Sequence, residues 1–303
     1  MSTQAVTSGP RGARGTARWV PTFRDLVSLT KPRVSSLVIA TSAAGMGLAP
    51  GEISKARAGV MLLGTLLCVA SANALNCFME RESDKLMTRT RNRALPAGRL
   101  DPSLALGFGL LLGAVSVPML VIGVNLVTGL LGLLALTSYV GVYTPMKSQS
   151  SAALIVGAVP GALPPLMGYT AVAGHIGAIG LHAFAILFLW QIPHVIGLAS
   201  FRKDDYVAAG IRVVPAVFGE RATKLQAVLW TVVLCAVSVL PYTLGWVSAW
   251  YLVPAFVLGA AYLVSTLRGF ASASLALWGR RVFVTSLFYL PLLFLALLFT
   301  RLG

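Results

Sequence analysis

A dense block of polar and charged residues follows directly on a long apolar segment in the first third of the chain. Within this block, Asn76, Glu80 and Asp84 recur at every fourth position, and Arg89 and Arg93 follow shortly after. On a continuous helix, positions four apart lie along one stripe, so we expect the three oxygen-bearing side chains to share a face. Oxygen ligands followed by guanidinium groups suit a magnesium ion and the phosphates that it carries.

The same spacing also fits a simpler alternative, a solvated helix end laced with ion pairs at the membrane surface. Three features favour a site instead. The block begins at Asn76, inside the apolar segment; its acidic residues are followed by several arginines; and a second acidic pair, Asp204 and Asp205, occurs in a later loop. Charged groups this close to hydrocarbon are costly, which indicates a functional reason for keeping them.

The elements that must position these residues are membrane helices. Of the 303 residues, 57% are hydrophobic and 11% are charged, far outside the composition of soluble proteins. Apolar stretches long enough to span a bilayer recur along the chain. They cover residues 34–50, 58–79, 103–122, 125–144, 152–172, 179–200, 224–245, 250–267 and 282–300. The predicted fold is therefore an all-α polytopic membrane protein with nine transmembrane helices in a bundle.

The net charge of +15 sets the orientation of this bundle and does not indicate a nucleic-acid partner. With a cytoplasmic N-terminus, Lys55, Arg57 and Arg301 fall on the outer side, which leaves 24 − 3 = 21 basic residues inside. Of the 9 acidic residues, only Glu52 falls outside. We therefore expect the active site on the cytoplasmic face and the C-terminus on the outer face. The basic excess favours anionic lipid or an anionic substrate.

Residues 1–22 carry arginines among Gly, Ser, Thr and Pro and contain no apolar core. They are expected to form a disordered basic cytoplasmic tail, which leaves residues 23–303 as a single transmembrane domain. The lack of an amphipathic presequence favours the plasma (inner) membrane of a prokaryote over a mitochondrial membrane.

The two acidic segments open toward the same side, four spans apart, which suggests a weak internal repeat of two four-helix units. Such an arrangement places both segments at the mouth of one central cavity, open to the cytoplasm. Facing carboxylates there would hold Mg²⁺ with a diphosphate between them. The predicted catalytic and metal-ligating residues are Asn76, Glu80, Asp84 and Asp205. The side chains predicted to neutralise the departing diphosphate are Arg89, Arg93, Lys147 and Lys203.

Two features within the apolar spans have more than one interpretation. Gly157 and Gly161 form a small-xxx-small pair, which is typical either of close helix packing or of a cavity wall. His194 is the only histidine deep in the cytoplasmic half of a predicted span. It is a hydrogen-bond partner between helices, a contact to the substrate, or an axial ligand for iron in a substrate.

The polar block resembles the signature of the UbiA-type intramembrane prenyltransferases. From Asn76 to Pro96 it runs Asn-x-x-x-Glu-x-x-x-Asp-x-x-Met-x-Arg-Thr-x-x-Arg-x-Leu-Pro. Further matches to the family cover residues 29–34, 143–147, 161–168, 190–194 and 205–211. The Pro-His pair at 193–194 and the Asp-Tyr-x-x-Ala-Gly loop at 205–210 are similar to the branch of the family that acts on heme.

This resemblance implies transfer of a farnesyl group from farnesyl diphosphate to a vinyl group of protoheme IX. Water is added in the same reaction, and the products are heme O and diphosphate, in the route to heme A. The family's ligands for Mg²⁺ and diphosphate fall on Asn76, Glu80, Asp84 and Asp205. Of the alternatives for His194, we expect it to bind and orient heme. The implied surroundings are the lipid bilayer and a heme A synthase or terminal oxidase assembly.

The sequence leaves two other functions open. Within the same family, the acceptor would be an aromatic acid or a quinone precursor instead of heme. In a different class, a cation-coupled transporter or lipid-binding membrane protein would use the acidic loops for a coupling ion. A transporter predicts polar residues near the bilayer midplane, whereas the charged residues here gather on one face. The length of the prenyl chain is not fixed by the sequence, because it depends on the depth of the cavity.

Overall fold

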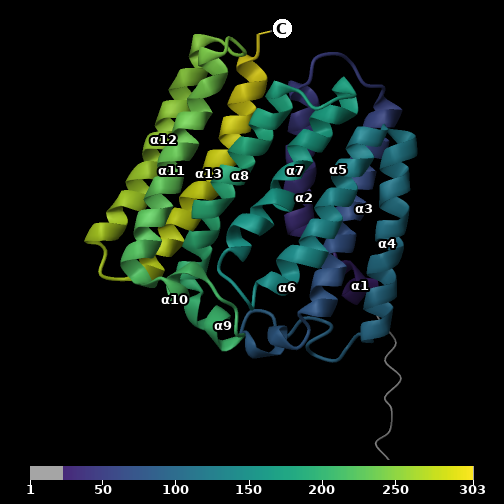
Figure 1. The fold of residues 1–303 in the computed structure, drawn as a ribbon, viewed down its shortest axis with the longest axis vertical. Helices are drawn as coiled ribbons and strands as arrows, with labels where there is room; N and C mark the ends of the chain where they lie inside the picture. Colours follow the sequence, from purple (N-terminus) through teal and green to yellow (C-terminus); the bar gives the residue numbers. More distant parts are fainter. Residues whose placement is uncertain (1–22, 303) are drawn as a thin grey trace, which may run out of the picture.

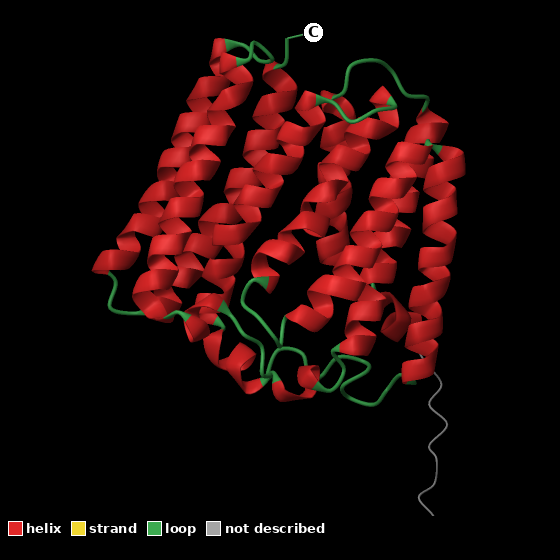
Figure 2. Cartoon of the chain, viewed as in Figure 1, coloured by secondary structure: helices red, strands yellow, loops and turns green. Residues whose placement is uncertain are grey.

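The structure is a computed structural model that describes residues 23–302. These residues form a bundle of long helices that run side by side (Figure 1; Figure 2). No β-sheet occurs in the described part of the chain, where Val247 and Arg301 form an isolated bridge. The predicted all-α class is therefore confirmed. The predicted disordered tail, residues 1–22, lies outside the described residues.

The bundle has two halves that follow each other in the sequence. The first comprises α1 (Phe23–Leu29), α2 (Pro32–Leu48), α3 (Lys55–Met79), α4 (Pro102–Gly123), α5 (Leu126–Thr137), α6 (Thr144–Met146) and α7 (Ala153–Ala173). The second comprises α8 (Ala178–Phe201), α9 (Lys203–Ala208), α10 (Val214–Val217), α11 (Gly219–Thr243), α12 (Leu252–Leu267) and α13 (Leu275–Thr300). Shorter segments are the 3-10 helices η1 (Ser83–Leu86), η3 (Ala249–Tyr251) and η4 (Arg268–Ala271) and the π-helical η2 (Ser138–Tyr143), which joins α5 to α6.

Eight helical segments of the described chain are long and apolar enough to cross a membrane. They run from α3 to α13, and each overlaps one of the predicted spans. The remaining predicted span, 34–50, corresponds to α2. Its 17 residues give a length of about 26 Å at the helical rise, against a hydrocarbon core of about 30 Å. A polytopic helical protein is therefore confirmed, and the count of nine spans stays a prediction.

Local sequence signals set where the first-half helices begin. Pro32 and Pro102 stand at the first positions of α2 and α4, where a missing backbone N–H leaves no hydrogen bond unmade. Ser54, Asp101 and Asn125 cap α3, α4 and α5, each accepting a backbone N–H from two or three residues further on. These signals place the helix starts within a few residues of the predicted spans.

Helices α2 and α7 pack with their backbones in close contact. A Cβ at Gly45 of α2 would collide with the backbone of Pro165, and a Cβ at Gly168 of α7 would collide with the backbone of Ser42. The Ser42 hydroxyl donates a hydrogen bond to the Pro164 carbonyl at 3.0 Å. Small residues here let two backbones approach, as is usual between membrane helices.

The connections 80–101, 147–152 and 202–213 gather at one end of the bundle together with α9 and α10, the lower end in Figure 1. We call this the loop end. The C-terminus lies at the opposite end (Figure 1). The two acidic segments predicted to share one side of the membrane therefore do lie at the same end of the bundle.

Candidate active site

A cavity of about 200 Å³ opens at the loop end. Its lining comes from α3, η2, α7, α8 and the loop-end connections. The charged and amide side chains in this lining are Lys31, Asn76, Glu80, Asp84, Arg89, Arg93, Lys147, Gln191 and Arg212. Six of the predicted site residues are thus brought together, whereas Asp205, Lys203 and His194 lie outside the lining.

The first acidic segment is not one continuous helix. Helix α3 stops one residue before Glu80, and Asp84 lies on the separate segment η1. The Arg81 and Ser83 side chains donate to carbonyl oxygens three residues back, at 2.7 and 3.0 Å. Because these side chains take carbonyls near the helix end, they favour termination over another turn. The predicted single helical stripe is therefore wrong, although all three of its oxygen-bearing side chains line the same cavity.

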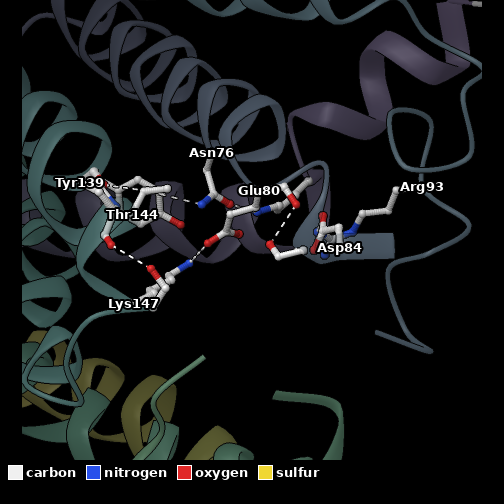
Figure 3. Close-up of polar contacts among 11 residues, drawn as sticks. Asn76, Glu80, Asp84, Arg93, Tyr139, Thr144 and Lys147 are labelled. Atoms are coloured by element: carbon white, nitrogen blue, oxygen red, sulfur yellow. Dashed lines mark hydrogen bonds and ion pairs between the residues drawn. The ribbon is translucent and has the colours of Figure 1, made fainter. Parts of the chain in front are cut away.

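Asn76 is buried on the last turn of α3 and is fixed on both sides of its amide. Its Nδ2 donates to Thr144 Oγ1 at 3.3 Å (Figure 3). Its Oδ1 accepts from Lys31 Nζ at 3.0 Å. Lys31 precedes Pro32 at the start of α2 with a left-handed φ of 48°, which is uncommon for a residue with a side chain. Burial lowers the pKa of Lys31. This residue adds a cation to the cavity that the spacing of the acidic block did not predict.

Glu80 pairs with a cation from the other side of the cavity. Its Oε1 lies 2.8 Å from Lys147 Nζ (Figure 3). The Lys147 ammonium also lies 4.4 Å from the centre of the Tyr143 ring, and the Tyr139 and Tyr143 rings are 5.1 Å apart. A carboxylate, an ammonium and two aromatic rings therefore meet on one wall.

Asp84 is the most deeply buried carboxylate of the site, with 1% of its surface exposed. Its Oδ2 accepts a hydrogen bond from Arg93 Nη1 at 2.8 Å (Figure 3). Its Oδ1 is buried and has no hydrogen-bond partner among the described residues. A buried carboxylate oxygen left unpaired is costly unless a donor or a cation reaches it.

The oxygen atoms of this cavity fit a magnesium ion that arrives with a phosphate substrate. The described residues contain no ready-made group of three His, Cys, Asp or Glu side chains that would hold a metal alone. Magnesium does not need such a cage, because it keeps waters and takes one or two carboxylates together with substrate phosphates. Asp84 offers a buried unpaired oxygen, and Glu80 adds a second carboxylate in the same lining.

The second acidic segment lies at the rim of the cavity. Asp205 Oδ1 accepts hydrogen bonds from the Thr88 hydroxyl at 2.6 Å and the Thr88 backbone N–H at 3.3 Å. These hydrogen bonds hold the pKa of the Asp205 carboxyl below its usual range. Its chain neighbour Tyr206 lines the cavity, and so do Met87 and Arg89 on either side of Thr88. Asp205 is therefore next in sequence to a lining residue, and so is Thr88, its hydrogen-bond partner on the other connection.

His194 faces helix α13 instead of the cavity. Its Nδ1 lies 2.6 Å from Ser286 Oγ, and its ring stacks on Trp190 with centres 4.5 Å apart. The Phe283 ring lies 4.7 Å away on the same helix as Ser286. This geometry matches the interhelical hydrogen-bond partner among the alternatives for His194, and contact with heme stays a prediction.

The two glycines of the small-xxx-small pair make room for cavity side chains. A Cβ at Gly157 would collide with the Tyr143 ring, and a Cβ at Gly161 would collide with the Gln191 amide. Gly157 itself lines the cavity. Of the two interpretations, the structure therefore favours the cavity wall.

Sequence reasoning missed several polar and aromatic side chains of the lining. The residues missed are Lys31, Tyr139, Tyr143, Gln191, Tyr206 and Arg212. Most of them lie in stretches that resemble the prenyltransferase family, and this resemblance was the sequence signal that could have identified them. Arg212 has a further structural effect, because its backbone N–H donates to the Lys147 carbonyl at 3.0 Å and ties two loop-end connections together.

A helical membrane bundle with carboxylates, amides and cations around one cavity suits an intramembrane enzyme with a charged substrate. The pattern of the UbiA prenyltransferase family matches residues 37–299. The chain belongs to the UbiA prenyltransferase family.

Within this family, the chain is similar to curated proteins that share one name. The chain is 51% identical to the protoheme IX farnesyltransferase of Myxococcus xanthus (strain DK1622) over 277 residues, which cover 91% of this chain and 94% of the relative. It is 42% identical to the protoheme IX farnesyltransferase of Rhodopseudomonas palustris (strain HaA2) over 282 residues, covering 90% of this chain and 89% of the relative.

Solved structures share the fold. A structure of a digeranylgeranylglyceryl phosphate synthase superposes with a TM-score of 0.78 at 14% identity, covering 91% of this chain and 97% of the other. A UbiA homolog from Archaeoglobus fulgidus bound to DMAPP and Mg²⁺ superposes with a TM-score of 0.62 at 14% identity, covering 90% and 99%. At such low identity, this likeness shows the fold alone.

Proposed function

We propose that this protein transfers the farnesyl group of farnesyl diphosphate to a vinyl group of protoheme IX, with addition of water, to give heme O and diphosphate. The observation that carries the proposal is the cavity, which combines carboxylates and cations with an apolar inner wall. This combination suits an isoprenoid diphosphate, whose head is anionic and whose tail is hydrocarbon. Similarity to relatives named as protoheme IX farnesyltransferases selects heme as the acceptor.

The cations of the loop end bind the diphosphate. Lys147 and Arg93 line the cavity, each 2.8 Å from one of its carboxylates, so both are within reach of a phosphate that enters. Arg89 lines the mouth, and Lys203 lies outside the lining as a further cation on the rim connection. Negative charge gathers on the departing diphosphate as the C–O bond breaks. These cations stabilise that charge more than they stabilise the intact substrate.

We assign Mg²⁺ as the cofactor, held by oxygen atoms of Asn76, Glu80 and Asp84, with Asp205 contributing from the rim. When bound, the ion supplies positive charge that neutralises diphosphate oxygens. Two observations support this donor set. Asp84 Oδ1 is buried without a hydrogen-bond partner, and the lowered pKa of Asp205 favours its ionised form.

The interior of the cavity protects the farnesyl cation that remains. The Tyr139 and Tyr143 rings line the cavity beside Lys147, and the negative faces of aromatic rings stabilise nearby cations. Apolar residues of α7 and α8 keep bulk water away. The heme vinyl group then attacks C1 of the farnesyl chain. Positive charge moves to the vinyl carbon next to the porphyrin, and water adds there.

Binding of both substrates requires the loop end to open. A cavity of about 200 Å³ is smaller than the roughly 300–1,000 Å³ typical of sites for drug-sized ligands. Two contacts tie the loop-end connections to one another, Thr88 with Asp205 and Arg212 with Lys147. We infer that these contacts break when the porphyrin enters and form again before the C–O bond is broken.

We place the loop end on the cytoplasmic side of a prokaryotic inner membrane, with the C-terminus outside. The distribution of basic residues supports this orientation, since 21 of the 24 fall on the loop-end side or on the tail. Product heme would pass to a heme A synthase or a terminal oxidase assembly, a step that rests on the family resemblance.

The test is an acceptor competition with purified protein, farnesyl diphosphate and Mg²⁺. Protoheme and an aromatic quinone precursor are offered together, and products are identified by mass spectrometry. The expected product is farnesylated, hydrated heme. Prenylation of the aromatic ring alone would make the protein a quinone-type prenyltransferase instead. No prenylated product, together with cation-driven uptake in vesicles, would favour the transporter.

A further inference from the structure

The inner wall of the cavity carries one polar side chain that the steps above do not use. Among the lining residues contributed by α7 and α8, both described in full, Gln191 alone has a polar side chain. The others are Ala153, Leu154, Gly157, Ala158, Val195, Ile196 and Ala199. Gln191 lies ten residues before the loop-end terminus of α8 at Phe201, or about 15 Å along the helix. A polar group at such depth in an apolar bundle indicates a function.

The Gln191 amide is held through its nitrogen and leaves its oxygen available. Nε2 donates to the Ala158 carbonyl at 3.3 Å and to the Leu187 carbonyl at 3.1 Å. No described residue donates to Oε1, and Oε1 is not among the fully buried unpaired atoms. Gly161 leaves the space that this oxygen occupies. The result is an anchored hydrogen-bond acceptor on an otherwise apolar wall.

This acceptor lies close to where the bonds change. Gly157 makes room for the Tyr143 ring, and that ring lies beneath the Lys147 ammonium that we assign to the diphosphate. Gly161, which makes room for Gln191, is four residues further along α7, or about 6 Å. The Gln191 oxygen is thus about one helical turn deeper than the diphosphate end of the site.

We propose that Gln191 Oε1 orients the water molecule that adds to the heme vinyl carbon. This inference rests on the proposed function. The C1–O bond of farnesyl diphosphate breaks, its electron pair leaves on diphosphate, and the vinyl π electrons form the new C–C bond to C1. A water lone pair then forms the C–O bond to the positive carbon, and the surplus proton passes to a diphosphate oxygen. Gln191 accepts one O–H of that water, which points the lone pair at the cation.

Without this acceptor, the same cation has a second outcome. It loses a proton from the neighbouring carbon and gives an alkene, with no oxygen added. The ratio of hydrated to alkene product therefore reports on Gln191 independently of how fast farnesyl is transferred. A purely structural role for the amide, joining α7 to α8, would change stability and rate but not this ratio.

Two variants distinguish the role of the Gln191 oxygen from that of its nitrogen. Gln191→Met removes both, whereas Gln191→Glu keeps an acceptor oxygen and removes the N–H donors. The full-length purified variants react with protoheme and farnesyl diphosphate, and both products are quantified by mass spectrometry. We expect the hydrated-to-alkene ratio to fall about tenfold in Gln191→Met and to stay within about threefold of wild type in Gln191→Glu. If Gln191→Met fails to fold, Gly161→Ala displaces the oxygen while leaving Gln191 in place, and the ratio should fall there too.

A wild-type ratio in Gln191→Met, or in Gly161→Ala where that variant replaces it, overturns the inference. Equal falls in Gln191→Met and Gln191→Glu also overturn it, because they assign the effect to the N–H donors. A wild-type protein that makes no farnesylated heme overturns the proposed function, and the inference with it. That result differs from a wild type that makes heme O while its Gln191 variants keep the same product ratio.

Discussion

The two acidic segments at the loop end hold their carboxylates in different ways. In the first, Glu80 and Asp84 line the cavity and pair with Lys147 and Arg93 at 2.8 Å. In the second, Asp205 lies at the rim, where its Oδ1 accepts hydrogen bonds at 2.6 and 3.3 Å from the neutral Thr88, and its Oδ2 lies 3.9 Å from the guanidinium of Arg202 on the same connection. The first segment is thus a charge-paired wall of the site, and the second is a link between two connections.

This difference assigns different functions to the two acidic segments, which the sequence pattern alone predicted to be equivalent metal ligands. Carboxylates beside cavity-lining cations are placed to hold a metal and a diphosphate where the C–O bond breaks. A carboxylate that is hydrogen-bonded to a neutral hydroxyl at the rim is placed to become a metal ligand when the connections close over the substrate. Variants in the first segment should therefore lose more activity than variants in the second.

The largest loss is expected for Asp84→Asn. It removes the charge beside the unpaired buried oxygen and leaves Arg93 without its ion pair, so heme O formation should fall about 10³-fold. The rate is measured by mass spectrometry under saturating farnesyl diphosphate. Glu82→Gln is the matched control, because Glu82 is exposed in the same connection and should stay near wild type. Equal rates for Asp84→Asn and the control would contradict the assignment of the inner carboxylate.

Glu80→Gln should lower the rate about 10²-fold, because it removes the second cavity carboxylate and the partner of Lys147. Glu80→Asp keeps an oxygen ligand and should lose less. Thermal unfolding of both variants separates loss of function from the cost of leaving a half-buried ammonium unpaired. A Glu80→Gln enzyme as active as Glu80→Asp would show that the charge at this position is not needed.

Asp205→Asn should lower the rate about 30-fold, less than either change in the first segment. The neighbouring Asp204→Asn is its control and should leave the rate unchanged, since Asp204 is exposed. A loss as large as that of Asp84→Asn would mean that Asp205 contributes as much to the metal site as the inner carboxylates do. A loss no larger than that of a Thr88 variant would reduce it to a link between connections.

Thr88→Val removes the one hydrogen bond that the hydroxyl donates to Asp205 and should cost about fivefold in rate. Because the pKa of Asp205 is lowered in the folded protein, the stability that this contact contributes is present above the usual carboxyl pKa. It is lost as the pH falls through the lowered pKa. The protection of residues 201–212 against hydrogen exchange, taken relative to the intrinsic exchange rate at each pH, should fall with falling pH in the wild type and be low at every pH in Thr88→Val. Identical exchange in the two proteins would contradict the link.

The smallest effect is expected for Lys203→Ala. Lys203 lies outside the cavity lining, so its charge acts at a distance and through water, and the KM for farnesyl diphosphate should rise about twofold. A rise as large as that of a Lys147 variant would require the second connection to reach much further into the site than it does in the structure.

The spans were the part of the fold most open to sequence reasoning. Helix α8 covers Ala178–Phe201 against a predicted 179–200, because an unbroken apolar run fixes a membrane helix by length. The predicted span 58–79 ends where α3 ends, but the expectation that the helix continues through Glu80 and Asp84 was wrong. Whether a helix continues past Glu80 depends on side chains such as Ser83 capturing its last carbonyls, and spacing does not reveal this.

The inward faces of the helices were equally hard to predict. A membrane helix is apolar all round, so no polar stripe marks which side meets the cavity. Gln191 and His194 are three residues apart on α8, yet Gln191 lines the cavity and His194 contacts Ser286 on α13. A block of carboxylates and arginines stands out in such a sequence, whereas an isolated Gln191, a tyrosine or Lys31 does not.

The most direct test of the magnesium and diphosphate site is the binding of farnesyl diphosphate to purified protein by calorimetry, with and without Mg²⁺, in wild type and in Asp84→Asn. We expect the wild type to bind at least tenfold more tightly when Mg²⁺ is present. Asp84→Asn should bind weakly and with little response to the ion. Equal affinities and an equal response to Mg²⁺ in the two proteins would contradict the central claim that the first acidic segment holds the metal and its diphosphate.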